Sequence, residues 1–189
     1  MLVKLAVLCL TATVCWAGFG TCPTPKTQSG FDLDKFMGTW YELEATPGKD
    51  SLTKCSTYVL EKKEKRKAAL LHKYISAVTG KVKSSFSEVS TPKSSEPAQL
   101  LVSPLKGTIM SRKWNLWVVD TDYETYAITY TCHQVLLNFY EEARILSRTK
   151  TLDDKKKMEI YAIMNKNNLP QKSLIEIDQT HKDCSKVDN

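Results

Sequence analysis

Histidine is scarce in this sequence of 189 residues, and the motifs of several enzyme classes are missing. The three histidines, His72, His133 and His181, do not have the spacing of metal ligands. The sequence contains neither the Gly-x-Ser-x-Gly motif of a hydrolase nucleophile nor a glycine-rich loop for a phosphate group. We therefore expect no enzymatic activity, no metal and no cofactor.

Beyond the N-terminus there is no apolar run of the roughly 20 residues that a membrane-spanning helix needs. The N-terminus has a positive charge at Lys4, continues with the largely apolar residues 5–14, and is followed by the small residues Ala17, Gly18 and Gly20. This order is typical of a secretory signal peptide. We expect residues 1–20 to be a signal peptide cleaved after residue 17 or 20, residues 21–189 to form one domain, and the mature protein to be secreted and extracellular.

Six cysteines are present, and two of them lie in the predicted signal peptide. The mature chain keeps Cys22, Cys55, Cys132 and Cys184. An even number in an oxidising compartment predicts two disulfides, and the residues alone leave three pairings open.

The formal net charge is +6, and the densest basic cluster is residues 62–67. This cluster stands between two strand-like runs, so we interpret it as a charged hairpin turn. Secretion and the lack of a nucleic-acid-binding motif argue against nucleic acid as a partner.

Eight strand-like runs alternate with turn residues at the spacing of an all-β, up-and-down antiparallel barrel. They are residues 39–46, 56–64, 68–76, 81–89, 98–103, 114–121, 124–132 and 142–147. A helix should follow, with Thr151 as its N-cap and Ile160, Ile163 and Met164 as the apolar stripe that packs on the outside of the barrel. Residues 174–177 should add a short edge strand.

Three motifs stand at the edges of these runs: Gly38-Thr39-Trp40-Tyr41-Glu42, Thr121-Asp122-Tyr123 and Ile145-Leu146-Ser147-Arg148. In this order they resemble the three signature motifs of the lipocalins. From Cys22 to Cys184 the chain is similar in style to apolipoprotein-D-like and insect bilin-carrying lipocalins. The resemblance implies an eight-stranded lipocalin barrel with one C-terminal helix outside, spanning residues 21–189.

The resemblance also implies how the barrel is closed. It pairs Cys22 with Cys132 and Cys55 with Cys184. It makes Trp40 the floor of the barrel, with Gly38 leaving room for the chain beneath and the guanidinium of Arg148 lying on the indole face, a cation–π contact of about 0.5–2 kcal/mol.

Side chains that line the lumen follow from strand alternation once Trp40 and Arg148 face inward. On the first and eighth strands this places Glu42, Glu44, Arg144 and Leu146 inside. On the sixth strand Trp117 matches a pocket tryptophan of the apolipoprotein-D-like proteins, and we expect Tyr126 and Ile128 to line the seventh strand. Ordinary core packing is the alternative for these aromatic residues.

Arg144 occupies the position at which the apolipoprotein-D-like lipocalins have a second pocket tryptophan. We expect it to make the lumen more polar and to suit a ligand with an acidic head group. An internal ion pair with Glu42, Glu44 or Glu142 and a position at the rim are the alternatives.

Lipocalin membership implies a carrier of a small hydrophobic molecule, such as a fatty acid, a retinoid, a sterol or a tetrapyrrole. One alternative is a barrel whose loops bind or inhibit another protein, and a weaker one is a lipocalin-type isomerase, which needs a free lumenal thiol. Residues 133–140 should form a loop at the mouth, where Val135, Leu136, Leu137 and Phe139 can make transient contact with a membrane or a lipoprotein particle.

Overall fold

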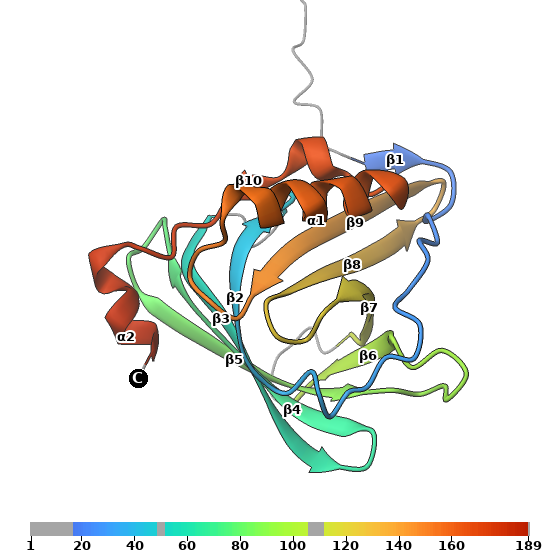
Figure 1. Cartoon of the computed structure of the whole chain (residues 1–189), viewed down its shortest axis with the longest axis horizontal. Helices are drawn as coiled ribbons and strands as arrows, with labels where there is room; N and C mark the ends of the chain where they lie inside the picture. Colours follow the sequence, from blue (N-terminus) through green and yellow to red (C-terminus); the bar gives the residue numbers. More distant parts are fainter. Residues whose placement is uncertain (1–16, 49–51, 106–111, 189) are drawn as a thin grey trace, which may run out of the picture.

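The computed structural model describes residues 17–48, 52–105 and 112–188, and these residues build one antiparallel sheet that closes on itself (Figure 1). Residues 1–16 of the predicted signal peptide lie outside the described residues. Within the described part of the chain, no helix is long and apolar enough to span a membrane.

Eight strands form the barrel. They are β2 (Gly38–Ala45), β3 (Thr53–Glu64), β4 (Lys67–Ser76), β5 (Val82–Ser90), β6 (Gln99–Pro104), β7 (Trp114–Thr121), β8 (Tyr126–Val135) and β9 (Asn138–Ser147). Each strand pairs with the next, and β9 also pairs with β2, which closes the cylinder. The predicted eight-stranded up-and-down barrel is confirmed.

Two short strands flank the seam between β9 and β2. Strand β1 (Ala17–Phe19) pairs with the first residues of β9, and β10 (Ile175–Glu176) pairs with the last residues of β2. The edge strand predicted near residue 175 is therefore present. Strand β1 was not predicted, because its residues lie within the expected signal peptide, residues 1–20.

Helix α1 (Asp154–Lys166) lies outside the barrel across β8 and β9 (Figure 1). Ile160 and Met164 are buried against the sheet, as expected from the apolar stripe. The predicted N-cap is wrong, because Asp153 rather than Thr151 accepts a hydrogen bond from the backbone N–H of Lys156 at 2.9 Å. The chain ends in the 3₁₀ turns η1 (Gln171–Ser173) and η2 (Lys182–Cys184) and the short helix α2 (Ser185–Asp188).

The barrel wall separates two apolar clusters. The inner cluster fills the closed half of the barrel and contains Trp40, Leu100 and Val118. The outer cluster lies between the sheet and helix α1 and contains Ile128, Ile145 and Ile160. A side chain of β7, β8 or β9 that packs in the inner cluster faces the lumen, and one that packs in the outer cluster faces helix α1.

Two disulfides attach the chain ends to this barrel. Cys22 is bonded to Cys132 of β8, and Cys55 of β3 is bonded to Cys184. These are the pairs that the resemblance implies. The second disulfide is packed with Ile75 and Val187, so that α2 is held against β4.

Candidate ligand-binding site

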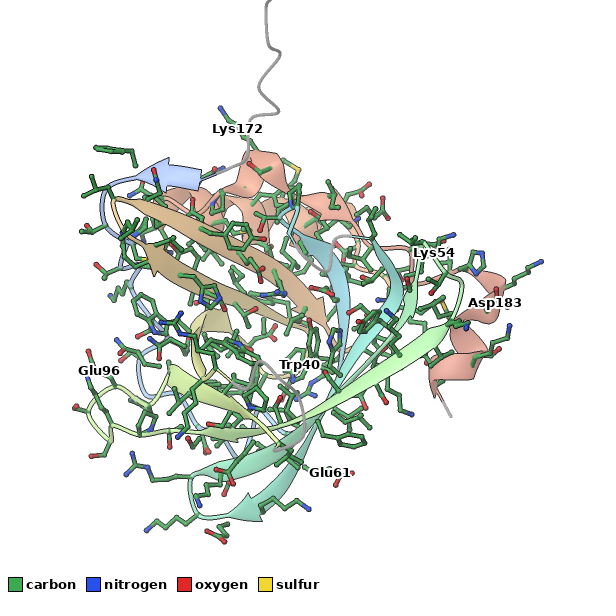
Figure 2. All side chains as sticks on the ribbon, turned by 180° about the vertical axis from the view of Figure 1, so that it is seen from behind. Trp40, Lys54, Glu61, Glu96, Lys172 and Asp183 are labelled. Carbon is green, nitrogen blue, oxygen red and sulfur yellow. A yellow bond between two sulfur atoms is a disulfide. The ribbon has the colours of Figure 1, made fainter. Side chains whose placement is uncertain are left out.

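The closed end of the barrel is built around Trp40, which is fully buried. The guanidinium carbon of Arg148 lies 3.6 Å from the centre of the indole ring. Gly38 has φ +95°, and a Cβ there would stand 3.2 Å from Nη1 of Arg148, so a side chain at this position would be strained and would crowd the guanidinium. Figure 2 shows Trp40 within the barrel, away from the labelled surface residues.

Arg148 also binds the backbone at this end. Its Nη1 donates to the carbonyl of Thr39 at 2.8 Å, and its Nε donates to the carbonyl of Tyr123 at 3.0 Å. One side chain thereby connects β2, β9 and the turn between β7 and β8. The three sequence motifs meet at the sealed end of the barrel.

Apolar side chains line the lower lumen above Trp40. They are Leu60, Leu70, Val89, Leu100, Val102, Val118, Ala127 and Leu146, with the half-buried Trp114 and Leu116 packed against them. The expected inward position of Leu146 agrees with this arrangement. The interior of the barrel is therefore apolar in its closed half.

A buried ion-pair network lies on the inner face of β2 and β9, above this apolar region. Nε of Arg144 lies 3.0 Å from Oε1 of Glu42, and Nη2 of Arg144 is bonded to the carboxylate of Glu142. Burial alone would lower the pKa of Arg144, but the attraction of Tyr58 and of the two carboxylates raises it above its ordinary value. The guanidinium thus stays charged, and two protein carboxylates already surround it.

His72 adds a neutral polar group to the same level of the barrel. Its ring is stacked between Tyr58 and Tyr74, with centroid distances of 4.2 and 4.9 Å, and its Nε2 lies 2.9 Å from the hydroxyl of Ser56. Burial, with a further contribution from the charge of Arg144, lowers the pKa of His72 to about 3. The imidazole is therefore uncharged at neutral pH. The sequence contains a signal for this position, because alternation along β4 places His72 on the same face as Leu70.

Two hydroxyl groups face this network from β8. Thr129 is paired in register with Arg144, and Thr131 is paired with Glu142. Both side chains are almost fully buried, and within the described residues their hydroxyls have no hydrogen-bond partner. Since buried polar groups normally find a partner, these hydroxyls are candidate contacts for a polar group of a ligand.

The predicted inward position of Glu44 is wrong. A β-bulge between Glu42 and Glu44 inserts Leu43 and pairs Glu44 with Ile145 of the outer cluster. The carboxylate of Glu44 instead accepts a hydrogen bond from the hydroxyl of Tyr161 in α1 at 2.7 Å. This bond ties the helix to β2.

The predicted inward positions of Trp117, Tyr126 and Ile128 are also wrong. Tyr126 and Ile128 belong to the outer cluster beneath α1, and Trp117 packs against that cluster. On β8 the inner face is taken by the small Ala127, which pairs with Leu146, so the large apolar residues face the helix. The tryptophan of β7 that packs against the inner cluster is Trp114.

Comparisons with known proteins agree with this architecture. Residues 37–181 match the lipocalin / cytosolic fatty-acid binding protein family. The chain is 32% identical to apolipoprotein D of Macaca fascicularis over 161 residues, which cover 85% of this chain and 83% of the relative. It is 29% identical to apolipoprotein D of Cavia porcellus over 164 residues, or 86% and 85% of the two chains.

The chain is a lipocalin. Its fold is similar to the solved structure of insecticyanin from the tobacco hornworm Manduca sexta, with a TM-score of 0.79, 23% identity, and coverage of 89% of this chain and 91% of the other. Lipocalins bind small hydrophobic ligands.

The mouth of this lipocalin differs from the predicted loop at residues 133–140. Strands β8 and β9 extend into that stretch and leave a turn of two residues, Leu136 and Leu137. Leu136 adopts the left-handed conformation at φ 55° and is 92% exposed. Residues 49–51, between β2 and β3, and residues 106–111, between β6 and β7, lie outside the described residues.

Gly48, which follows β2, lies over the polar part of the lumen. A Cβ placed on Gly48 would collide with the hydroxyl of Tyr140 and would stand 3.0 Å from Oε1 of Glu142. Glycine at this position therefore allows the backbone to lie directly on the ion-pair network. Sequence alternation gives no signal for this contact, because it involves a loop and a distant strand.

Proposed function

We propose that this lipocalin is a secreted carrier that holds one small hydrophobic molecule, such as a fatty acid, a retinoid, a sterol or a tetrapyrrole, in the barrel lumen. The observation that carries the proposal is the apolar lower lumen, sealed by Trp40 and Arg148 and bounded above by polar side chains. A ligand could bury its hydrocarbon below and direct its polar group at Thr129 and Thr131.

Secretion is supported by the N-terminal sequence and by the two disulfides, which persist in oxidising compartments. A carrier without catalytic activity is supported by the cysteines of the described residues. All four are disulfide-bonded, so none of them supplies the free lumenal thiol that the isomerase alternative needs.

The polar group of the ligand is inferred from the surroundings of Arg144. An incoming carboxylate would have to displace Glu42 or Glu142 from the guanidinium, and it would meet the other carboxylate at close range. Like charges at such distances repel strongly where water is excluded. We therefore favour a lumenal ligand with an uncharged head group and keep the acidic head group as the alternative.

Isolation from the native source, followed by mass spectrometry of co-purified small molecules, tests the carrier proposal directly. A matched pair of variants then locates the molecule. Ser87 is buried and lies opposite Leu70 on the inner face of β5, whereas its neighbour Glu88 faces outward. We expect Ser87→Phe to weaken the binding of retinol at least tenfold and Glu88→Phe to leave it unchanged, as measured by retinol fluorescence.

Equal affinities in the two variants would exclude the lumen as the site. Should Ser87→Phe fail to fold, Ser85→Phe provides a second obstruction, because Ser85 lies opposite His72 nearer the mouth and is exposed.

The head group is tested with retinol and retinoic acid, which share one hydrocarbon body. If Arg144 binds an acidic head group, Arg144→Leu should weaken retinoic acid by about 10- to 150-fold and leave retinol nearly unchanged. Under our proposal retinol binds the parent protein more tightly than retinoic acid, and Arg144→Leu shifts both affinities alike through the damaged ion-pair network.

We also propose that the β8–β9 turn makes transient contact with a membrane or a lipoprotein particle. Val135, Leu136 and Leu137 are 60, 92 and 69% exposed. Such an apolar tip is costly in water unless it has a partner. Leu136→Glu should reduce flotation of the protein with phosphatidylcholine vesicles, and unchanged flotation would remove the turn from the contact.

A further inference from the structure

Strands β7 and β8 separate near the open end of the barrel. Their pairing runs from Thr121 and Ala127 to Trp117 and Tyr130. Beyond that point, residues 114–116 remain paired with β6, and residues 131–135 remain paired with β9. The barrel wall therefore has a lateral gap between the start of β7 and the end of β8.

This gap holds a pocket of about 540 Å³, within the range of about 300–1,000 Å³ of small-molecule sites. We call it the lateral pocket. Its lining includes Arg112, Lys113, Trp114, Trp117, Tyr130 and Thr131. Trp114 and Thr131 come from the inner face of the wall, whereas Trp117 and Tyr130 come from the outer face. The pocket thus extends through the wall, and it shares Trp114 with the inner cluster and Thr131 with the polar part of the lumen.

Aromatic rings give the lateral pocket its apolar surface. The rings of Trp117 and Tyr130 lie 6.1 Å apart and are tilted by 41°, and both remain in place through the outer cluster. The hydroxyl of Thr131, which has no partner within the described residues, belongs to the same lining. A ligand with an apolar body and one polar end fits these contacts.

The charge of the lateral pocket is positive. Arg112 and Lys113 are exposed at its rim, and none of the described residues that line it is acidic. The neighbouring carboxylate of Glu141 accepts a hydrogen bond from the hydroxyl of Tyr130 at 2.7 Å. An anionic end group at the rim is therefore favoured over a cationic one.

One side of the pocket is fixed before any ligand binds. The disulfide between Cys22 and Cys132 holds the N-terminal segment against β8. The side chain of Gln134 donates to the carbonyls of Leu136 and Asn138 at 3.0 and 2.9 Å, and it accepts from the N–H of Cys22 at 2.9 Å. Such preorganisation lowers the entropy lost on binding.

We propose that the lateral pocket is a second binding site of this lipocalin, and that it takes an amphipathic carboxylate, a long-chain fatty acid, with the chain against Trp114 and Trp117 and the carboxylate at Arg112 and Lys113. The proposal does not depend on the ligand of the lumen.

The test uses quenching of Trp117 by 9,10-dibromostearate, because bromine quenches tryptophan emission at short range. The background protein is the mature chain, from which Trp16 is removed with the signal peptide, and it carries Trp114→Phe and keeps Trp40 and Trp117. We expect dibromostearate to quench this protein and Trp117→Phe to remove most of the quenching. Equal quenching with and without Trp117 would overturn the proposal.

Charge provides a second test that leaves the packing intact. In the same background, Arg112→Gln combined with Lys113→Gln should weaken dibromostearate about 5- to 30-fold, and dibromostearyl alcohol less than twofold. Lys62→Gln combined with Lys63→Gln removes the same charge at the opposite end of the barrel and should change neither affinity by more than twofold. Equal losses in the two double variants would overturn the assignment of the rim.

Ser87→Phe separates this site from the lumen. Quenching of Trp117 should persist in that variant even when retinol binding is lost, and it should also persist if retinol proves not to bind at all. Loss of Trp117 quenching in Ser87→Phe, with Glu88→Phe unaffected, would place the fatty acid in the lumen and overturn the proposal.

Discussion

Arg148 and Trp40 form the seal of the barrel, with the guanidinium carbon 3.6 Å from the indole centroid. The same guanidinium donates to the carbonyls of Thr39 and Tyr123, so its position is fixed by backbone as well as by the ring. Trp40 is fixed in turn by a hydrogen bond from its Nε1 to the carbonyl of Phe36 at 2.9 Å. Packing and hydrogen bonds therefore both fix the positions of Arg148 and Trp40.

Truncation of Trp40 should destabilise the fold strongly. We expect Trp40→Ala to lower the free energy of unfolding by about 3–5 kcal/mol, because it empties the floor and removes the apolar partner of Arg148. Urea denaturation measures this change. Phe86→Ala is the control, since Phe86 is 57% exposed on β5 and should cost less than about 0.5 kcal/mol. Arg148→Ala should fall between the two, and a Trp40→Ala protein as stable as Phe86→Ala would mean that the indole does not seal the barrel.

His72 should make stability depend on pH. Its pKa is about 3 in the folded protein and 6.5 in the unfolded chain, so the unfolded state binds more protons between these values. The stabilisation that depends on a neutral His72 is fully present above pH 6.5. It decreases as the pH falls, by about 2 kcal/mol in the free energy of unfolding between pH 7 and pH 5. In His72→Gln the stability difference between pH 7 and pH 5 should shrink by that amount. An unchanged difference would show that His72 titrates normally.

The ion-pair network of Arg144 should be strongly non-additive. Arg144→Leu leaves two buried carboxylates without their cation and should cost about 3–5 kcal/mol. Combining it with Glu42→Gln and Glu142→Gln removes that conflict, so the triple variant should recover most of the lost stability. If the triple variant were instead less stable than Arg144→Leu alone, the carboxylates would be held by groups other than Arg144.

The disulfides should be complete and strongly stabilising. Peptide mapping without reduction should recover Cys22 linked to Cys132 and Cys55 linked to Cys184, with no reactive thiol among these four. Replacing Cys55 and Cys184 together by serine should cost about 4–5 kcal/mol by the chain-entropy model, since the closed loop exceeds a hundred residues. A thiol titrating at any of the four positions would contradict this prediction.

The sequence predicts the barrel and its seal well, because short motifs and strand alternation contain that information. Prediction of the lumen fails where a strand departs from regular alternation. The extra residue Leu43 turns Glu44 outward, and residues 42–45 contain no sequence signal for the bulge. On β7 a second irregularity, between Val118 and Asp120, separates Trp117 from the motif that begins at Thr121.

Strand β8 illustrates a different limit. It has no bulge, yet its large residues lie outside, because helix α1 needs an apolar surface to cover and β8 supplies it. Alternation identifies two faces of a strand but does not say which one is the lumen. The apolar stripe of Ile160 and Met164 was the available signal that the outer face also had to be apolar.

The overlapping arrangement of the two disulfides has a mechanical consequence. Because Cys22 is joined to Cys132 and Cys55 to Cys184, the shortest covalent path between the two ends of the domain runs only from Cys22 to Cys55 and then across the second bond. That path contains roughly 30 residues and extends to about 100–120 Å. Under a pulling force the oxidised domain could extend only by the length of this path. Reduction of the disulfides would allow the remaining residues of the domain to extend as well.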